Sequence, residues 1–274
     1  MNKKWINIFG WTPSFRRANP ITILTYHSIN TKRDPYTISP NTFYRQIEFI
    51  RSNFPIIRLN EIKEAMTDKE SSRKVVITFD DAFSDFYEVA FPVLENLTIP
   101  SSVSIPTAFI GRFNEWDYPY HKFHKRPLMN AHQLQQLNKT QLVDFGSHSV
   151  DHLRMNKLPV KEMRHQAAVS KRTLEDLLST SVVTFAYPYG RLVDFSSLTT
   201  KVLAETGYEI GLTAHWGTRN TIKDILCLRR IYLRETDSPD TIRAKIEGGY
   251  EWIPLLKEKV ISGMRALKKI IAVN

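Results

Sequence analysis

The sequence predicts an α/β barrel that is closed or nearly closed. Seven short runs rich in β-branched and aromatic residues recur along the chain, and segments with helical spacing of apolar residues lie between them. Strands that alternate with helices pair in parallel through right-handed crossovers. Without a dinucleotide-binding fingerprint, this number of strands favours a barrel over an open sheet. The predicted strands are 21–27, 75–81, 101–111, 142–149, 182–188, 208–214 and 226–233.

Four helices are predicted between these strands from the spacing of their apolar residues. Serine is a good N-cap, and we expect Ser84 and Ser197 to cap the second and fourth of these helices. Gly207 stands where the fourth helix should end. The predicted helices are 41–54, 84–97, 160–178 and 197–207.

The chain reads as one domain, from residue 20 to 250, because no repeat, low-complexity tract or Gly/Ser linker divides it. An extension, 1–19, precedes this domain, and residues 251–274 follow it. From residue 252 onward, apolar residues recur at helical spacing with lysines on the other face. This pattern predicts a basic amphipathic helix, which docks either on its own domain or on an anionic membrane surface.

The composition favours a soluble protein in a reducing compartment. The single cysteine, Cys227, excludes an internal disulfide and a cysteine-based zinc cluster. No stretch has the continuous apolar run of a signal peptide or a membrane span, so we expect a cytoplasmic location. Lys and Arg outnumber Asp and Glu by 38 to 28, giving a net charge of +10. This excess favours a polyanionic partner, although many basic proteins have none.

Polar residues stand at the ends of the predicted strands, where the active site of a parallel barrel lies. The buried run 75–79 leads directly into two adjacent carboxylates, Asp80 and Asp81. Other strands aim further polar groups at the same rim. These are His27, His148, the run Tyr187-Pro188-Tyr189, and Arg230.

His148 and His152 form the sharpest local cluster. If Ser149 begins a helical turn, both imidazoles project from one side and suit a single divalent metal. The alternative is two exposed polar residues on a loop. Either Asp80 or Asp81 would complete a ligand set of two histidines and one carboxylate, leaving the other as a base. The alternative for the aspartates is an N-cap of the helix that starts near Ser84.

Three motifs follow one another along the chain: Thr78-Phe79-Asp80-Asp81, His148-Ser149-x-x-His152 and Phe185-Ala186-Tyr187-Pro188-Tyr189-Gly190. Together they resemble the polysaccharide deacetylases, the NodB-homology or carbohydrate esterase family 4 group. The resemblance covers about residues 20–235. It implies a distorted, TIM-like (β/α)7 barrel, a bound divalent metal, often zinc, and hydrolysis of an N-acetyl group from an amino sugar.

The resemblance also implies roles for individual residues. Asp80 corresponds to the catalytic base, and Asp81, His148 and His152 correspond to the metal ligands. The backbone amide of Tyr189, beside Pro188, corresponds to the group that stabilises the oxyanion.

Two departures from the commonest family pattern are similar to the branch that acts on poly-N-acetylglucosamine exopolysaccharides. Ala186-Tyr187 stands where many members have an Arg before the Pro, and Leu24-Thr25-Tyr26-His27 near the N-terminus replaces the usual C-terminal Leu-x-His. By this resemblance His27 is the catalytic acid. We expect Arg230 to orient Asp80 in place of the missing arginine, with a surface ion pair as the alternative for Arg230 or Arg229.

The expected function is that of a metal-dependent de-N-acetylase, a hydrolase of carbon–nitrogen bonds other than peptide bonds. Its expected substrate is a polysaccharide or a lipid-linked glycan containing N-acetylhexosamine, its metal is Zn²⁺ or another first-row ion, and nucleic acid is not expected. A lipid-linked substrate would bring the enzyme to the inner face of a membrane. The alternatives are a sugar-formamide deformylase and a carbohydrate-binding barrel without catalysis. The aromatic-rich loop 112–127 either stacks on sugar rings over the site or packs on the barrel.

Overall fold

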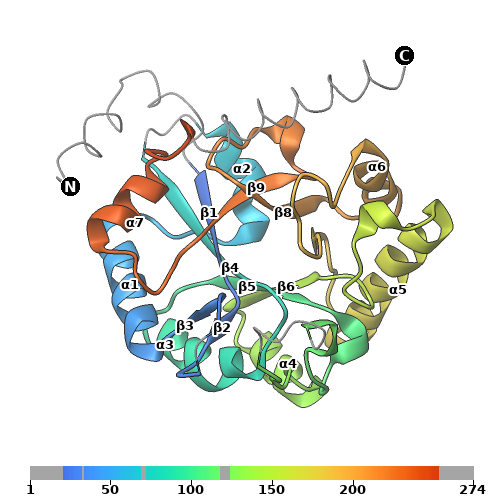
Figure 1. Ribbon diagram of the computed structural model, residues 1–274, viewed down its shortest axis with the longest axis horizontal. Helices are drawn as coiled ribbons and strands as arrows, with labels where there is room; N and C mark the ends of the chain where they lie inside the picture. The colour runs from blue at the N-terminus through green and yellow to red at the C-terminus, as the bar shows by residue number, and fades with distance from the viewer. Residues whose placement is uncertain (1–20, 33, 69–71, 118–123, 253–274) are drawn as a thin grey trace, which may run out of the picture.

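The computed structural model describes residues 21–252, except 33, 69–71 and 118–123. In this part of the chain, parallel strands close into a barrel, and helices surround it (Figure 1). The strand order around the barrel is β1-β4-β5-β6-β7-β8-β9. The predicted α/β barrel is therefore confirmed. The predicted extension and nearly all of the predicted amphipathic helix lie outside the described residues.

Every predicted strand is present. Most are shorter than predicted, and Pro106, which has no amide hydrogen for the ladder, follows the end of β5. Two further short strands, β2 (Ser28–Ile29) and β3 (Thr37–Ile38), pair with each other in the loop after β1. The barrel strands are β1 (Ile21–Tyr26), β4 (Lys74–Phe79), β5 (Ser101–Ile105), β6 (Val143–Ser147), β7 (Thr184–Ala186), β8 (Ile210–Trp216) and β9 (Leu228–Tyr232).

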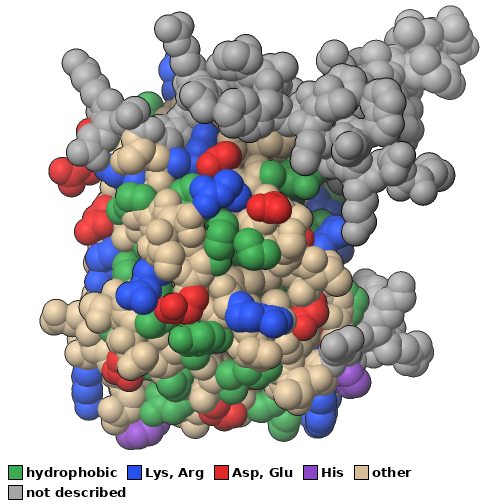
Figure 2. Space-filling model, turned by 90° about the vertical axis from the view of Figure 1, so that its left-hand side faces the viewer, with side chains coloured by type: hydrophobic (Ala, Val, Ile, Leu, Met, Phe, Trp, Pro, Cys, Tyr) green, Lys and Arg blue, Asp and Glu red, His purple; other side chains and the backbone are tan. Residues whose placement is uncertain are grey.

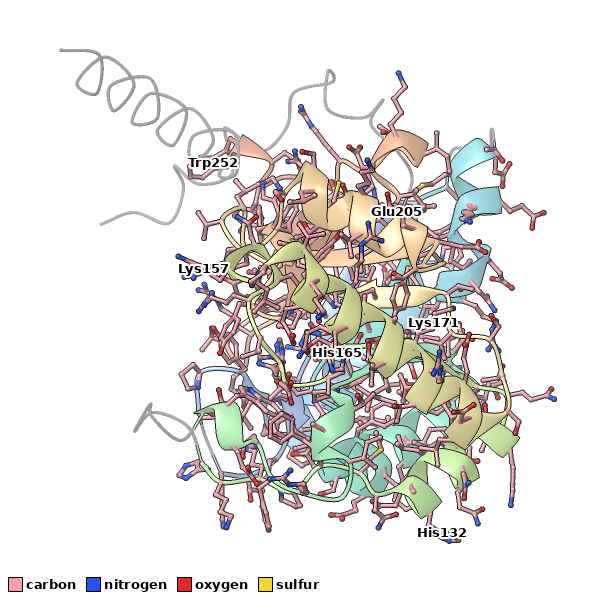
Figure 3. The ribbon with its side chains drawn as sticks, turned by 90° about the vertical axis from the view of Figure 1, so that its right-hand side faces the viewer. His132, Lys157, His165, Lys171, Glu205 and Trp252 are labelled. Carbon is pink, nitrogen blue, oxygen red and sulfur yellow. The ribbon has the colours of Figure 1, made fainter. Side chains whose placement is uncertain are left out.

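Three helices that the sequence analysis did not predict, α2, α4 and α7, join the predicted ones. The second predicted helix is divided into a π-helical segment, Phe86–Ala90, and α3. In Figure 3, α5 crosses the outside of the barrel with Lys157 near its start and Lys171 further along it. The α-helices are α1 (Pro40–Asn53), α2 (Ile62–Thr67), α3 (Phe91–Asn96), α4 (Ala131–Lys139), α5 (Val160–Leu178), α6 (Ser197–Glu205) and α7 (Pro239–Ile246).

Both predicted N-caps were wrong, for different reasons. The cap of α6 is Ser196, whose hydroxyl accepts a hydrogen bond from the Thr199 amide, so Ser197 is the first helical residue. Ser84 caps no helix, because the N-cap position of the helical segment that follows is Asp85. The predicted stop is present: α6 ends two residues before Gly207, which has a φ of +81°.

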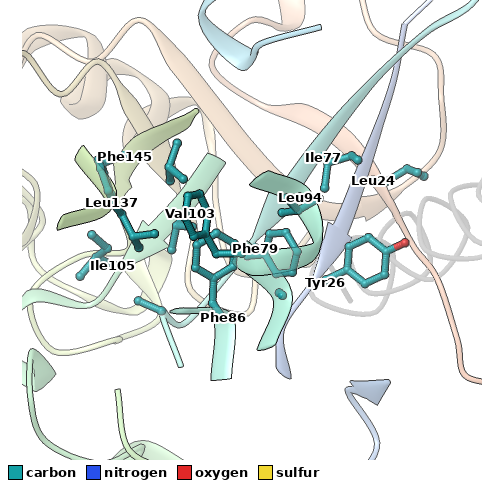
Figure 4. Close-up of a cluster of buried hydrophobic side chains, with 14 of the residues drawn as sticks. Leu24, Tyr26, Ile77, Phe79, Phe86, Leu94, Val103, Ile105, Leu137 and Phe145 are labelled. Atoms are coloured by element: carbon teal, nitrogen blue, oxygen red, sulfur yellow. The ribbon is translucent and has the colours of Figure 1, made fainter. Parts of the chain in front are cut away.

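The barrel core packs aromatic rings directly beneath the carboxyl ends of the strands. In Figure 4, Tyr26 and Phe79 lie side by side, with ring centroids 5.3 Å apart, and Phe86 contacts Phe79 at 4.7 Å. Burying each such side chain contributes about 1.5–3 kcal/mol. Tyr26 and Phe79 are also partners in the β1–β4 register, so the next residues, His27 and Asp80, leave their strands at the same level.

One face of the molecule can be compared with the predicted preference for a polyanionic partner. On the side where α1 and α7 lie, Lys and Arg side chains are interspersed with Asp and Glu (Figure 2). Among the described helices, none combines the length and the apolar content needed to cross a membrane.

Candidate active site

The carboxyl ends of two barrel strands, β4 and β6, bring one carboxylate and two imidazoles together. Asp81 lies two residues after β4, and His148 directly after β6. Oδ1 of Asp81 is 3.4 Å from Nε2 of His148 and 3.3 Å from Nε2 of His152. One ligand atom from each residue lies within 4.8 Å of the other two, and all three residues are buried. Side chains 71 residues apart in the chain thus share one small volume.

The loop that carries the two histidines differs from the helical turn that the sequence analysis predicted. Residues 149–152 form no helix, and Ser149 and His152 both have positive φ, +65° and +54°. The Gln166 side chain holds the loop by accepting hydrogen bonds from the amides of Val150 and Asp151. The imidazoles converge through these left-handed residues rather than through helical spacing.

The three side chains fit a divalent cation. Oδ1 of Asp81 is buried and makes no hydrogen bond of good geometry to any described residue. Nδ1–H of His148 donates to the Ala186 carbonyl at 2.8 Å, so Nε2 is the nitrogen that faces Asp81. Such a backbone partner fixes the tautomer of a metal-ligating histidine. A cation among these atoms would satisfy the carboxylate oxygen and both nitrogens.

The pKa shifts of the three side chains also favour binding of a divalent cation. Burial would raise the pKa of Asp81, but the imidazoles of His148 and His152 hold it well below its usual range. Burial lowers the pKa of His152 overall, so this ring is neutral at physiological pH. Burial also opposes protonation of His148, but the neighbouring Asp81 and Asp80 raise its pKa. Metal binding at such a site releases the proton from an imidazole.

Asp80 faces a different partner, the buried guanidinium of Arg230 in β9. The two side chains form a two-point ion pair, with distances of 2.9 Å for Nη1–Oδ1 and 2.5 Å for Nη2–Oδ2. Arg230 also donates to the Thr213 carbonyl and to the hydroxyls of Thr25 and Thr78. The Arg230 side chain is fully buried, so the alternative of a surface ion pair does not apply to it.

The ion pair keeps Asp80 ionised. Burial would raise the pKa of Asp80, but Arg230, with smaller contributions from His148 and His27, lowers it to about 2. Neither aspartate acts as an N-cap, because the π-helical segment that follows has Asp85 at its N-cap position and no side-chain capping bond. The two adjacent carboxylates therefore have separate partners, one a guanidinium and the other a pair of imidazoles.

His27 leaves β1 beside these groups and is half-buried. Its ring stacks on the ring of Tyr36, with centroids 5.0 Å apart and an interplanar angle of 23°. Its charge, when protonated, contributes to lowering the pKa of both Asp80 and Asp81. Tyr36 is 53% exposed and had no signal in the sequence analysis, because its place depends on how the loop after β1 folds back.

Tyr189 and Pro188 follow β7 in a tight turn. The Gly190 amide donates to the Pro188 carbonyl at 2.7 Å, and Tyr189 in between has a φ of +61°. The Tyr189 ring meets His152 edge-on at 5.0 Å. The Arg154 guanidinium lies over the Tyr189 ring, 3.6 Å from its centroid, and donates a hydrogen bond to Asp194. Neither Arg154 nor Asp194 was singled out from the sequence.

The aromatic-rich loop 112–127 contributes to the site through Trp116, which stacks on His152 with centroids 4.5 Å apart. The same indole packs on Phe109 and on the small cluster around Phe83. Part of this loop therefore packs on the protein, as one alternative predicted, and Trp116 also reaches the site. Stacking on sugar rings stays a prediction. The central residues of the loop, 118–123, lie outside the described part of the chain.

Comparison with known proteins decides the family. The family model for polysaccharide deacetylases matches residues 67–211, slightly more than half of the chain. The chain belongs to the polysaccharide deacetylase family. The matched range contains Asp80, Asp81 and both histidines of the triad but not His27 or Arg230. The prediction of a hydrolase acting on carbon–nitrogen bonds is confirmed at the level of this family.

Two curated relatives illustrate the family. The chain is 26% identical over 250 residues to YxkH of Bacillus subtilis (strain 168), which is provisionally described as a polysaccharide deacetylase, and the match covers 90% of this chain and 83% of YxkH. It is 28% identical over 192 residues to the poly-beta-1,6-N-acetyl-D-glucosamine N-deacetylase of Staphylococcus aureus (strain MRSA252). That match covers 65% of this chain and 63% of the staphylococcal protein, less than two thirds of its length.

Solved structures share the fold. IcaB from Ammonifex degensii superposes with a TM-score of 0.71 at 22% identity, covering 83% of this chain and 97% of IcaB. The Streptococcus pyogenes deacetylase PplD, solved in complex with acetate, gives 0.69 at 22% identity, covering 82% and 97%. At this level of identity, the likeness shows the same distorted barrel.

Proposed function

We propose that this polysaccharide deacetylase is a metal-dependent hydrolase that removes N-acetyl groups from a glycan containing N-acetylhexosamine. The observation that carries the proposal is the buried triad of Asp81, His148 and His152 with the ionised Asp80 beside it. One group of side chains suits a cation, and the adjacent carboxylate suits a base. Metal-assisted amide hydrolysis uses both functions within reach of one carbonyl group.

In this proposal Asp81, His148 and His152 hold the metal, and zinc is the expected ion because it favours such mixed nitrogen and oxygen ligands. The cation supplies Lewis acidity toward the amide carbonyl and lowers the pKa of a water molecule. Other first-row ions fit the same ligands, and the metal content of the purified protein identifies which ion is bound.

The chain's own residues would move the protons. Asp80 accepts a proton from the attacking water, and Arg230 keeps this carboxylate oriented and ionised between turnovers. The backbone amide of Tyr189 donates to the carbonyl oxygen as negative charge develops on it. His27 donates a proton to the departing nitrogen, because an amide anion is a very poor leaving group. The products are acetate and a free amino sugar.

The substrate class rests on the relatives. The staphylococcal relative is named for poly-beta-1,6-N-acetyl-D-glucosamine, and we propose a related N-acetylhexosamine polymer or a lipid-linked glycan for this chain. Trp116 and Tyr36 support a sugar substrate, because exposed or half-exposed aromatic faces beside the triad suit stacking on pyranose rings. The proposed location is the cytoplasm, with contact at the inner membrane face if the glycan is lipid-linked.

The test is product analysis with the purified full-length chain. Protein stripped with a chelator and reloaded with Zn²⁺ is incubated with oligomers of β-1,6-linked N-acetylglucosamine and with a lipid-linked N-acetylhexosamine. We expect release of acetate by the reloaded protein but not by the stripped protein. Formate released from N-formyl analogues without acetate would indicate a deformylase. Binding of sugar without either product would indicate a barrel that binds carbohydrate but does not cleave it.

A further inference from the structure

A second buried polar cluster lies beside the site and does not touch the triad. Its centre is Arg126, whose side chain is 5% exposed. The guanidinium donates to the Lys32 carbonyl and to the Thr37 hydroxyl, each at 2.7 Å, and pairs with Asp34 at 2.7 Å. It also contacts the Ser28 hydroxyl. These partners all belong to the loop between β1 and α1, so one side chain holds this loop at four places.

Asp85 holds the same loop from the other side. Its carboxylate accepts hydrogen bonds from the Ser28 hydroxyl at 2.5 Å and from the Ile29 amide at 3.2 Å. Arg126 also lies 3.5 Å from Asp85. Burial of two carboxylates and one guanidinium is costly unless hydrogen bonds compensate it, and here the loop backbone and hydroxyls bond to both Nη atoms of Arg126. The loop is therefore fixed by specific polar contacts as well as by apolar packing.

The loop carries His27 and Tyr36, the stacked pair at the mouth of the site. The amide of Tyr36 donates to Asp34, which in turn is paired with Arg126. Ser28, held by Arg126 and Asp85, is the residue after His27. His27 is therefore adjacent in the chain to one partner of Arg126, and Tyr36 is hydrogen-bonded to another.

Arg126 also belongs to the loop that reaches the triad. Its backbone is paired with Asn114 in both directions, since its amide donates to Asn114 Oδ1 at 2.7 Å and its carbonyl accepts from the Asn114 amide at 3.1 Å. Trp116, two residues further on, stacks on His152. The same residue therefore ties the loop with the candidate acid to the loop that covers a candidate metal ligand.

We propose that Arg126 is a positioning residue for His27, holding the β1–α1 loop so that the imidazole stays on the site rim against Tyr36. The inference rests on the proposed function, because it assigns His27 the role of proton donor. A misplacement of about 1 Å can reduce a rate about 100-fold, so a loop that carries a catalytic group needs such support.

The experiment uses Arg126→Lys, which keeps the positive charge but cannot reach the Asp34, Lys32 and Ser28 groups together. Asp34→Asn is the second variant if the first does not fold, because it keeps the size of the side chain and removes half of an ion pair. Arg58→Lys is the matched control, since Arg58 makes an ion pair with Asp144 and bonds the Gln141 carbonyl near the start of β6, at the opposite end of the barrel.

Hydrogen exchange of the full-length protein is the first readout and needs no activity. We expect amides of residues 28–37 to exchange at least about 10-fold faster in Arg126→Lys and in Asp34→Asn, with β1 and β4 unchanged, and no change at 28–37 in Arg58→Lys. Unchanged exchange at 28–37 in both site variants would overturn the proposal. If the wild type released no acetate, the proposed function would fail while this readout still decided the role of Arg126.

A double-mutant cycle with His27→Ala is the second readout. We expect Arg126→Lys to lower kcat for acetate release about 10- to 100-fold with KM changed less than about threefold and metal content unchanged. In the His27→Ala background, the same substitution should lower kcat by less than about twofold. An equal loss in both backgrounds would show that Arg126 does not act through His27 and would overturn the proposal.

Discussion

Asp80 and Asp81 are adjacent in the chain but have different surroundings. The backbone turns sharply after β4, where Asp81 has a φ of +70°, and this turn sends the two carboxylates to different partners. Asp80 meets Arg230, which holds its pKa at about 2, and Asp81 meets His148 and His152. In the proposed reaction, one carboxylate is therefore available as a base while the other holds the metal.

Asp80→Asn tests this division of roles. We expect the variant to keep its metal, because the triad is intact, and to lose at least about 100-fold in kcat, since the amide cannot accept a proton from water. Metal content and acetate release are measured on the same preparation. Asp144→Asn, which removes the partner of Arg58 away from the site, is the control and should retain wild-type activity. Wild-type turnover by Asp80→Asn would exclude Asp80 as the base.

The buried pair of Asp80 and Arg230 also makes stability depend on pH. The pKa of Asp80 is about 2 in the folded state, below its ordinary value of 3.8, so between these values the unfolded chain binds more protons. Above about pH 4, the ionised Asp80 therefore contributes its full stabilisation to the folded state. The free energy of unfolding should fall by roughly 2 kcal/mol as the pH drops through 2. Urea unfolding of chelator-treated protein at pH 2–5 measures this. Asp80→Asn should lack this component, and an identical pH slope in both proteins would contradict the assignment.

Sequence patterns identified the titratable residues at the strand ends but not the loop residues that pack against them. Asp81, His148 and His152 lie at strand ends, and their spacing gave a signal. Arg230 was expected to orient Asp80, but the sequence alone could not exclude a surface ion pair. Neighbouring strand residues point to opposite sides, and only the closed barrel decides which one is inside. Trp116 and Tyr36 reach the site through loops whose path has no periodic pattern.

At the level of elements, the tight turns after the strands place the functional groups. Among the described residues, eight other than glycine have positive φ, and five of these are at the site: Asp81, Ala82, Ser149, His152 and Tyr189. Such conformations are costly and persist only where the surroundings enforce them. The helical turn expected for residues 149–152 was wrong because this spacing can also be produced by two left-handed residues.

Gly190 is needed in the turn after β7. A Cβ atom there would lie 2.5 Å from the Ala214 amide nitrogen, in addition to the cost of its φ of +57°. We expect Gly190→Ala to lower the free energy of unfolding by about 1–3 kcal/mol and to reduce kcat, because β8 would push the Tyr189 turn out of place. Gly207→Ala is the control, since Gly207 also has a positive φ but its added Cβ would meet only the end of Lys171 at 3.6 Å. Equal effects in the two variants would argue against a steric requirement at Gly190.

The capping of α6 offers a separate test of the fold. Ser196→Ala removes the hydroxyl that accepts from the Thr199 amide and should cost about 1 kcal/mol in denaturant unfolding. Ser197→Ala, at the exposed first residue of the helix, should change stability by less than about 0.5 kcal/mol. A larger effect at Ser197 would support the cap that the sequence analysis predicted.

The helices that the sequence analysis missed are mostly short, and helical periodicity is weak over six to nine residues. α4 and α7 nevertheless begin with capping residues, Asn130 and Ser238, which could have served as signals. The π-helical segment before α3 had no such signal.

On the scale of the whole molecule, closure of the barrel explains why residues distant in sequence share one rim. β1 pairs with both β4 and β9, which brings His27 and Arg230 to Asp80. The strand pattern alone predicted seven parallel strands and a common rim. It could not predict the contacts between βα loops, such as those of Arg126, because these depend on how separate loops pack after the barrel has closed.

The central claim is that Asp81, His148 and His152 bind one divalent cation. The most direct measurement is elemental analysis of the purified full-length protein after loading with Zn²⁺ and removal of free metal. We expect about one zinc per chain in the wild type and in His165→Ala, whose exposed imidazole lies on α5 (Figure 3). His148→Ala and His152→Ala should lose the metal. Equal metal content in the wild type and both triad variants would show that these three residues do not bind the cation.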